Sequence, residues 1–199
     1  MTTEAVSLFL ALLAVVAQMA VVAAVVLAAG GRVSPGLARL RQAAVETVGP
    51  QALTLAFVVA AVSMAGSLYF SEAANFPPCR LCWYQRICMY PLVPVLGLAA
   101  WRGDRSIRPY AAVLAAIGAF IAAYHVLLER YPTLETSVCE PTTPCTVVWV
   151  RRFGYLTIPA MALSAFALIL TLMAVAGGDR ARHQAEVEAT TPASTGRAS

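Results

Sequence analysis

The sequence predicts an all-α membrane protein that crosses the bilayer five times. Of its 199 residues, 60% are hydrophobic and 12% are charged, whereas soluble domains are about half apolar and about a quarter charged. Five apolar stretches approach the roughly 20 helical residues that span a hydrocarbon core: 5–29, 52–70, 83–101, 110–128 and 156–176. In lipid these stretches must be helical, because every backbone polar group needs an internal partner.

The first stretch, 5–29, is predicted to be a retained transmembrane helix. Its start, MTTEAVS, contains Glu4 and no Arg, and its apolar run is far longer than the core of a signal peptide. A cleaved signal peptide is the alternative, because the stretch ends in small residues, VLAAGG.

Two connecting segments are predicted to be helices on the membrane surface. SPGLARLRQAAVETVGP has Ser34 as its N-cap, Pro35 at the first helical position, and Gly49 and Pro50 as a stop. PCTVVWVRRFGY, residues 144–155, places aromatic residues and arginines where an interfacial helix would use them. An ordinary connecting loop is the alternative for both segments.

Proline and polar residues mark where the remaining helices should bend or stop. Pro91 and Pro94 should kink the 83–101 helix or end its first turns. From Gly177 onward the chain becomes polar and rich in small residues, so 177–199 is predicted to be a disordered tail.

The arginines predict the orientation in the membrane. All fourteen basic residues are Arg, and threading the five helices alternately places most of them on one side. That side receives Arg32, Arg39, Arg41, Arg102, Arg105, Arg108, Arg180, Arg182 and Arg197. Basic residues favour the cytoplasmic side, so the N-terminus is predicted outside and the C-terminus inside. Because the arginines form no runs with interleaved aromatic residues, nothing indicates nucleic-acid binding.

The five cysteines form two close pairs on the predicted extracytoplasmic face, where disulfides persist. The pairs are Cys79/Cys82 and Cys139/Cys145, and Cys88 remains as a predicted small buried residue. A disulfide across CEPTTPC would contribute only roughly 2 kcal/mol through chain entropy. The pattern therefore favours pairs that exchange electrons. Structural disulfides and a four-thiolate zinc site are the alternatives.

The segment CRLCWYQR predicts a reactive thiol pair at the start of a helix. Pro77 and Pro78 discourage helix before Cys79, and a thiol at a helix N-terminus is favoured as thiolate. Arg86 lies one turn beyond Cys82 on the same face, where its charge would stabilise a thiolate or a bound oxygen anion. Gln85 could donate a hydrogen bond to the same ligand. An Arg86 that simply reaches the lipid headgroups is the alternative.

His125 and Glu129 lie on one face near the outer end of the 110–128 stretch, on the same side as the cysteines. A histidine at membrane depth indicates a functional site, where it could bind a ligand carbonyl or relay protons. A histidine satisfied by packing contacts is the alternative.

The segment CRLCWYQRICMYP resembles the signature of the disulfide bond formation protein B (DsbB) family, especially its Gram-positive BdbC-type branch. YHVLLER, CEPTTPCT and FGYLTIPAMAL resemble that branch in the same order and spacing. The resemblance covers about residues 52–176, and its C-x-L-C-x-x-Q-R core is highly specific.

The resemblance implies a four-helix bundle in the bacterial plasma membrane, with two extracytoplasmic cysteine pairs. Such a protein reoxidises a DsbA-like thioredoxin-fold thiol oxidase and passes the electrons to the membrane quinone pool, menaquinone or ubiquinone. No bound metal is implied. The chain then divides into an extra N-terminal transmembrane helix (1–30), a cytoplasmic amphipathic linker (31–51), the bundle (52–176) and the tail (177–199).

The resemblance also assigns roles to individual residues. Cys139 and Cys145 would be the loop pair that meets the partner, and Cys79 and Cys82 the pair near the membrane. Cys82 would be the thiolate beside the quinone. The predicted quinone-binding residues are Arg86, Gln85 and His125, of which His125 matches a family position least closely.

Three other functions remain alternatives to this assignment. In the vitamin K epoxide reductase-like family, which is also quinone-coupled, the loop cysteines precede the C-x-x-C, whereas here they follow it. A non-catalytic membrane scaffold with structural disulfides is a second alternative. A secondary transporter is the third, although the predicted spans contain almost no carboxylates.

Overall fold

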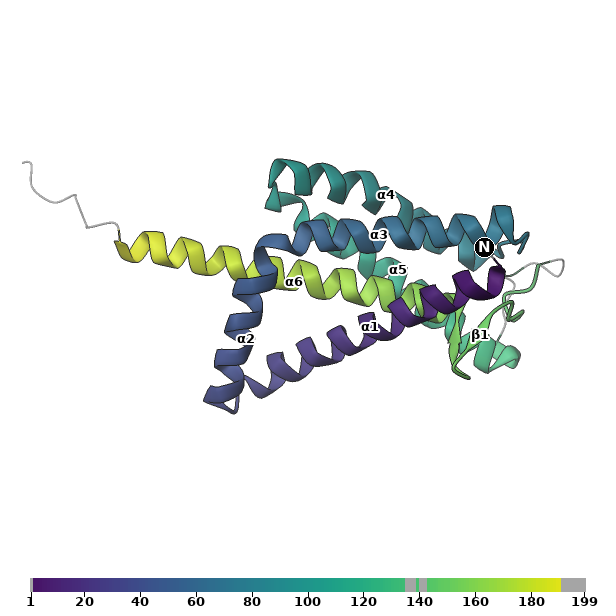
Figure 1. The fold of residues 1–199 in the computed structure, drawn as a ribbon, viewed down its shortest axis with the longest axis horizontal. Coiled ribbons are helices and arrows are strands. Elements are labelled where there is room, and N and C mark those ends of the chain that lie inside the picture. Colours follow the sequence, from purple (N-terminus) through teal and green to yellow (C-terminus); the bar gives the residue numbers. More distant parts are fainter. Residues whose placement is uncertain (1, 135–138, 140–142, 191–199) are drawn as a thin grey trace, which may run out of the picture.

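The computed structural model describes residues 2–134, 139 and 143–190, which form six α-helices and one small hairpin (Figure 1). The helices are α1 (Thr3–Gly30), α2 (Pro35–Val48), α3 (Ala52–Leu68), α4 (Arg80–Arg102), α5 (Arg108–Arg130) and α6 (Ile158–Thr190). The strands are β1 (Arg151–Arg152) and β2 (Leu156–Thr157). Short turns of 3₁₀-helix are η1 (Gly49–Gln51), η3 (Arg105–Ile107) and η4 (Pro132–Leu134), and a π-helical turn, η2 (Tyr69–Ala73), follows α3.

Helices α3 to α6 form a four-helix bundle. Helix α3 packs against α4 and α6, and α5 packs against the same two helices from the other side. The bundle core contains the fully buried side chains of Leu92, Leu96, Phe166 and Ile169. At Gly118, a Cβ atom would lie 2.3 Å from Cζ of Phe166, so only glycine allows α5 to approach α6 this closely.

Helix α1 lies outside the bundle and packs on α6 (Figure 1). Polar contacts help to hold it there. Gln18 Nε2 donates to Ser164 Oγ at 2.9 Å, and Arg152 donates to Ser7 Oγ from Nε at 3.1 Å and from Nη2 at 2.8 Å. Helix α2 then crosses the far end of the bundle and leads into α3. Its bounds confirm the predicted helix after Ser34, although the Ser34 side chain makes no capping hydrogen bond.

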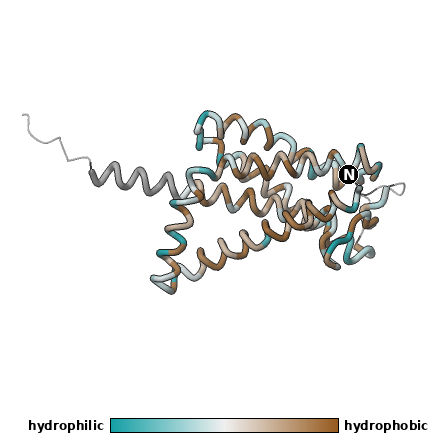
Figure 2. Tube along the Cα trace, viewed as in Figure 1, coloured by the Kyte–Doolittle hydropathy of each residue, from teal (hydrophilic) through white to brown (hydrophobic). Residues whose placement is uncertain are grey.

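Among the described residues, four helical segments are long and apolar enough to cross a membrane: Thr3–Gly30, Pro35–Ala73, Arg105–Arg130 and Ile158–Gly178. The chain is therefore a multi-pass membrane protein, and Figure 2 shows the apolar residues along these helices. Helix α4 is not among the four, although the sequence predicts a span there. The polar side chains of Gln85 and Arg86 lower its mean hydropathy.

The two ends of the molecule carry different segments, with the cysteine pairs at one end and several arginines at the other. The N-terminus, the hairpin and the start of α4 lie together at one end, and α2 and the α4–α5 connection lie at the other (Figure 1). Both cysteine pairs belong to segments of the first end, which we call the cysteine end. The segments that carry Arg32, Arg102 and Arg105 lie at the opposite end, as the alternating helices predict.

Three segments differ from the sequence-based expectation. The predicted surface helix at 144–155 is wrong: its last residues form β1 and the hairpin turn, in which Phe153 (φ 49°) and Gly154 (φ 77°) have left-handed backbones. Helix α4 runs through Pro91 and Pro94 without ending. Helix α6 continues to Thr190, whereas the sequence predicts a disordered tail from Gly177.

Candidate functional site

The first cysteine pair lies at the N-terminus of α4. Cys79 is the N-cap residue, with an extended backbone (φ −70°, ψ 172°), and the Cys82 N–H donates to its Sγ at 3.3 Å. This confirms that the helix starts just after the first cysteine, following Pro77 and Pro78. Both thiols are free, and their Sγ atoms are 2.9 Å apart. The geometry is that of a reduced dithiol in which one sulfur donates its proton to the other.

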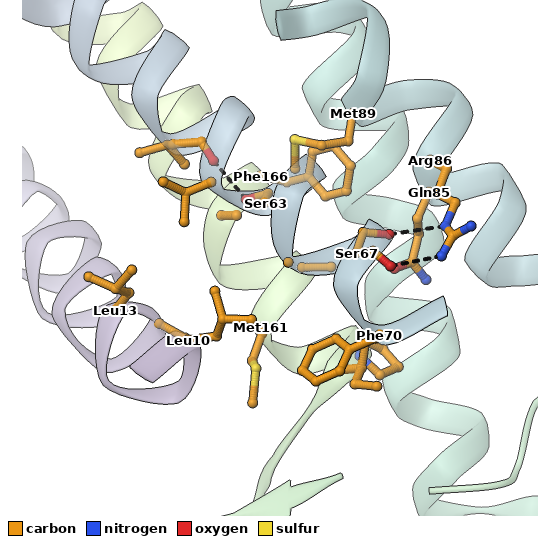
Figure 3. Close-up of a pocket in the computed structure, with 18 of the residues that line it drawn as sticks. Leu10, Leu13, Ser63, Ser67, Phe70, Gln85, Arg86, Met89, Met161 and Phe166 are labelled. Carbon is orange, nitrogen blue, oxygen red and sulfur yellow. Dashed lines mark hydrogen bonds between the residues drawn. The ribbon is translucent and has the colours of Figure 1, made fainter. Parts of the chain in front are cut away.

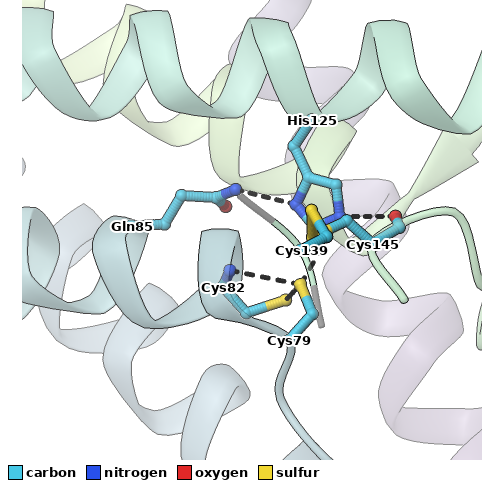
Figure 4. The surroundings of a disulfide bond; sticks show 6 residues. All are labelled: Cys79, Cys82, Gln85, His125, Cys139 and Cys145. Carbon is cyan, nitrogen blue, oxygen red and sulfur yellow. Dashed lines mark hydrogen bonds between the residues drawn. A yellow bond between two sulfur atoms is a disulfide. The ribbon is translucent and has the colours of Figure 1, made fainter. Parts of the chain in front are cut away.

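His125 of α5 lies beside this dithiol and is held from two sides (Figure 4). Its Nε2 atom is 3.0 Å from the carbonyl oxygen of Cys145, and its Nδ1 atom is 3.0 Å from Nε2 of Gln85. A carbonyl oxygen only accepts, so His125 Nε2 carries the hydrogen and Nδ1 accepts from the Gln85 amide. The imidazole thus directs its Nε2 N–H towards Cys145 and towards Cys79 Sγ, 3.7 Å away.

The hydrogen bonds of the site favour a thiolate on Cys79. The hydrogen bond from the Cys82 thiol, aided by His125 and the Cys82 backbone N–H, lowers the pKa of Cys79 from 9.0 to about 4, although burial opposes the shift. The remaining proton of the pair then stays on Cys82. In this redox state the thiolate thus lies on Cys79, whereas the family resemblance assigns a thiolate to Cys82.

The second cysteine pair, Cys139 and Cys145, is joined by a disulfide with an S–S distance of 2.03 Å. Cys145 is buried and belongs to the same apolar cluster as Cys79, Leu81 and Leu128. Figure 4 shows this disulfide next to His125 and Cys79. The two pairs, distant in sequence, are therefore neighbours at the cysteine end.

A small cavity of about 30 Å³ lies between the dithiol and α5. Cys79, Cys82, His125 and Glu129 contribute to its lining, and Glu129 accepts a hydrogen bond of 2.5 Å from Thr157. A cavity of this size can hold one water molecule. The site can therefore place a water next to both thiols and a carboxyl group.

The same residues have the atom types of a metal site. One ligand atom each of Cys79, Cys82 and His125 lies within 4.8 Å of the other two. The four-thiolate zinc alternative does not fit this state, because Cys139 and Cys145 are bonded to each other and cannot act as thiolate ligands.

A larger cavity of about 510 Å³ lies between α1, α3, α4 and α6 (Figure 3). Its lining is mostly apolar, with polar groups on one side from Cys82, Gln85, Arg86 and Ser67. In the part of the chain that the structure describes, Cys82 is the cysteine that lines both the small and the large cavity. Cys82 therefore connects the thiol chemistry of the cysteine end with an apolar binding space.

Arg86 is fixed at the edge of the larger cavity by α3. Its Nε and Nη2 atoms donate to Oγ and to the carbonyl oxygen of Ser67, both at 3.0 Å. Its guanidinium also lies 5.2 Å from the centre of the Trp83 ring, and Tyr90 donates to Ser67 Oγ at 3.2 Å. These contacts hold the guanidinium against the bundle. They argue against the alternative in which the Arg86 side chain simply extends to the lipid headgroups.

The structure separates the predicted ligand-binding residues into two groups. Arg86 and Gln85 line the larger cavity, and Gln85 also orients His125. Of the two cavities, His125 lines the small one, together with Cys79 and Cys82. Cys88 is buried in the bundle core, as predicted.

The sequence analysis did not identify Ser67 as part of the site. Ser63 and Ser67, spaced four residues apart in an apolar stretch, are the signal that could have indicated a polar face on α3. It also did not identify Trp149, whose ring stacks on Phe76 at 5.2 Å and helps to line both cavities.

Comparison with known proteins identifies relatives for most of the chain. A family model described as "Disulfide bond formation protein DsbB" matches residues 49–176. Disulfide bond formation protein C of Bacillus subtilis (strain 168) is 45% identical over 129 residues, covering 64% of this chain and 94% of the relative. Probable disulfide formation protein C 2 of Bacillus anthracis is 38% identical over 121 residues, covering 61% and 86%.

A third relative, the probable disulfide formation protein of Oceanobacillus iheyensis, is 41% identical over 122 residues, covering 60% of this chain and 84% of the relative. No solved structure shows a significant match. The family match begins at η1, so it contains the bundle and both cysteine pairs and leaves α1 and α2 outside.

Proposed function

Because the chain belongs to the disulfide bond formation protein DsbB family of disulfide-forming oxidoreductases, we propose that it reoxidises an extracytoplasmic DsbA-like thioredoxin-fold protein and passes the electrons to a membrane quinone. The enzyme would be a quinone-dependent protein-dithiol oxidoreductase. Two electrons move from the partner through the loop pair, Cys139/Cys145, to the pair at the start of α4, Cys79/Cys82. They leave at Cys82, towards the larger cavity.

The first exchange takes place at the loop disulfide. A partner thiolate attacks Cys139, the Cys139–Cys145 bond breaks, and a partner–Cys139 disulfide forms with a thiolate left on Cys145. The family position of Cys139 and its greater exposure support this choice, since Cys145 is only 1% exposed.

The second exchange joins the two pairs. The Cys145 thiolate attacks Cys79 in an oxidised Cys79–Cys82 pair, a Cys79–Cys145 disulfide forms, and Cys82 leaves as thiolate. The shared apolar cluster of Cys79 and Cys145, and the His125 Nε2 atom directed at both residues, support this step. This step would produce a thiolate on Cys82, next to the larger cavity, as the family resemblance predicts.

The last exchanges release the partner. Its second thiolate attacks the mixed disulfide, so oxidised partner leaves and Cys139 becomes a thiolate. Cys139 then attacks Cys145, which restores the loop disulfide and frees Cys79. The state described above, with a loop disulfide and a Cys79/Cys82 dithiol, corresponds to the end of this sequence.

The larger cavity has the features of a quinone site. Its volume of about 510 Å³ and apolar lining are typical of small-molecule pockets, in which a few polar groups fix the orientation of the ligand. Arg86 would donate to a ring oxygen, with its plane held by Ser67. A quinone bound there would supply a two-electron, two-proton acceptor. Cys82 offers the sulfur at which the pair can be reoxidised.

We propose the following topology. Helix α4 is the fifth span, because it lies within the bundle next to α3 and α5. The N-terminus is extracytoplasmic, and the end with α2 faces the cytoplasm, since it carries most of the arginines. In this topology the chain divides into a transmembrane α1 (1–30), a cytoplasmic linker (31–51), the bundle (52–176) and a cytoplasmic C-terminal tail (177–199), into which α6 extends.

The observation that carries this proposal is the position of Cys82, which lines both cavities. The test is an assay of the purified protein with a reduced DsbA-like protein as donor and a short-chain quinone as acceptor. We expect one quinone to be reduced for each donor disulfide formed. Donor oxidation that does not depend on added quinone, or no oxidation at all, would contradict the proposal and favour a scaffold with structural disulfides.

A further inference from the structure

We propose that α1, which lies outside the part of the chain matched by the family, forms one wall of the acceptor cavity and selects acceptors by their apolar portion. This inference rests on the proposed function, because it concerns the larger cavity as the quinone site. Neither the cysteine chemistry nor the family match gives α1 a role, and this inference assigns one to it.

The lining of the cavity supports the inference. Residues of α1 contribute Phe9, Leu10, Leu13, Ala14, Val16 and Ala17. Figure 3 shows Leu10 and Leu13 on the side of the cavity opposite Gln85 and Arg86. A ring held at Arg86 would therefore direct its substituents towards α1, which offers only apolar side chains there.

Helix α1 is fixed in place by one face. Along this face Ser7, Ala11, Ala14 and Gln18 follow a helical spacing of three or four residues. Ala11 and Ala14 pack into a buried cluster with Leu156 and Ala160. Small residues let two helices approach closely in a membrane, so this face is the contact of α1 with α6.

Polar contacts fix the helix at both ends of this face. Arg152 binds Ser7 Oγ and the Glu4 carbonyl oxygen, and Gln18 bonds Ser164 and the Tyr155 hydroxyl. The bonds to Ser7 and Ser164 are part-buried, and those to Glu4 and Tyr155 are exposed. Together they restrain both rotation and sliding of the helix. The orientation of Leu10 and Leu13 towards the cavity is thereby set.

Leu10 also closes the gap between α1 and α3. A Cβ atom at Gly66 would lie 2.8 Å from Leu10 Cδ1, so the leucine side chain rests directly on the α3 backbone. The cavity is thus bounded by α1 on the side that α3 and α6 leave uncovered. The width of the space next to Ser67 and Met161 depends on the side chains that α1 presents.

Point variants in the full-length protein test the inference, and α1 itself provides a matched control. Leu13→Ala removes a cavity-lining side chain, whereas Leu12→Ala truncates the neighbouring leucine, which is 50% exposed and does not line the cavity. For a prenylated quinone we expect Leu13→Ala to raise KM about tenfold, which corresponds to about 1.4 kcal/mol of binding. We expect kcat to stay unchanged, and Leu12→Ala to leave both constants unchanged.

A second variant narrows the larger cavity, whereas Leu13→Ala widens it. Ala17→Leu should raise KM for a prenylated quinone more than for the same ring without a side chain, and Ala23→Leu, on the exposed side of α1, serves as its control. If the cavity-lining and control variants behave alike while quinone is still reduced, α1 is not a wall of the acceptor site. The proposed function would stand in that case.

Photolabelling provides a readout that does not depend on turnover. The first arginine of the chain is Arg32, so trypsin releases α1 as the single peptide 1–32. A photoreactive prenylated quinone should label this peptide, and excess unlabelled quinone should compete. If the label that excess quinone reduces is found only on peptides from α3 or α4, the role of α1 is overturned, but the quinone site in the larger cavity is supported. Label that excess quinone does not reduce would overturn both.

Discussion

The Nε2 atom of His125 lies 3.7 Å from the Sγ atom of Cys79. The imidazole is held in this position by the Gln85 amide on one side and the Cys145 carbonyl oxygen on the other. A single histidine thus contacts one sulfur of the first pair and the backbone of the second. This relationship links the acidity of Cys79 to the position of the loop that carries Cys145.

Removing the thiol of Cys82 should raise the pKa of Cys79. The lowered pKa of about 4 means that Cys79 remains a thiolate as the pH falls from neutral to about 4. In a reduced background that lacks Cys139 and Cys145, the ultraviolet absorbance of this thiolate should persist at pH 6. Cys82→Ala should remove most of that signal, because the strongest hydrogen bond to the thiolate is lost, and His125→Ala should remove less. Cys88→Ala is the control and should change nothing; an unaltered signal in Cys82→Ala would refute the hydrogen-bonded dithiol.

Cys82→Ser should separate partner exchange from electron release. The loop disulfide remains available, so the reduced partner should still form a mixed disulfide that is visible on non-reducing gels. Quinone reduction should be lost, because the sulfur that lines the larger cavity is gone. A Cys82→Ser protein that reduces quinone at the normal rate would exclude the proposed route.

Arg86→Ala should raise KM for quinone and leave exchange with the partner unchanged. Hydrogen bonds to a charged group contribute roughly 1.5–3 kcal/mol, so the rise should be about 10- to 100-fold. Ser67→Ala removes the acceptor of the Arg86 Nε bond and should give a smaller rise, since the carbonyl contact remains. Steady-state kinetics with a short-chain quinone measure both. If KM does not change in Arg86→Ala, the guanidinium does not bind the acceptor.

Gly118→Ala should destabilise the bundle. The added Cβ would meet the Phe166 ring at 2.3 Å, and overpacking of this kind typically costs about 1–3 kcal/mol. Gly36→Ala is the matched control, because a Cβ there meets only Ser34 Oγ at 3.7 Å. Thermal unfolding in detergent should therefore show a lower midpoint for Gly118→Ala alone. Equal midpoints would mean that α5 and α6 do not pack through Gly118.

Single cysteines at exposed positions test the orientation. Ser106, between α4 and α5, is predicted to face the cytoplasm, and Thr133, at the cysteine end, is predicted to face outward. In intact cells a membrane-impermeant maleimide should label Thr133→Cys, and Ser106→Cys only after permeabilisation, with the wild type as background. The reverse pattern would place both cysteine pairs in the cytoplasm and contradict the proposed function. Glu140, another candidate for labelling, lies outside the described residues.

The sequence predicts the helices and the first cysteine pair well because these depend on local features. Long apolar runs correspond to α1, α3, α5 and α6, and Pro77 and Pro78 set the start of α4 after Cys79. The hairpin is different. Its aromatic and basic residues suit a surface helix, and only the left-handed turn at Phe153 and Gly154, which brings β1 back to β2, excludes one.

The partners within the site could not be predicted, because they depend on tertiary packing. Spacing places Arg86 one turn from Cys82, but only the approach of α3 brings Ser67 to its guanidinium. Likewise, His125 is recognisable as a polar residue in an apolar stretch. Its contact with Cys79 instead of the larger cavity follows from how α5 packs against α4 and the loop.

The contact of α1 with α6 also constrains how the protein is made. Gln18 and Ser164 are 146 positions apart, so the first of the described helices to be synthesised docks on the last. During translation α1 must wait in the lipid until α6 has been inserted. A nascent chain that has already exposed Cys79 and Cys82 therefore still lacks two walls of the larger cavity, α1 docked on α6. If that cavity is the proposed acceptor site, electron transfer can begin only when synthesis of the bundle is complete.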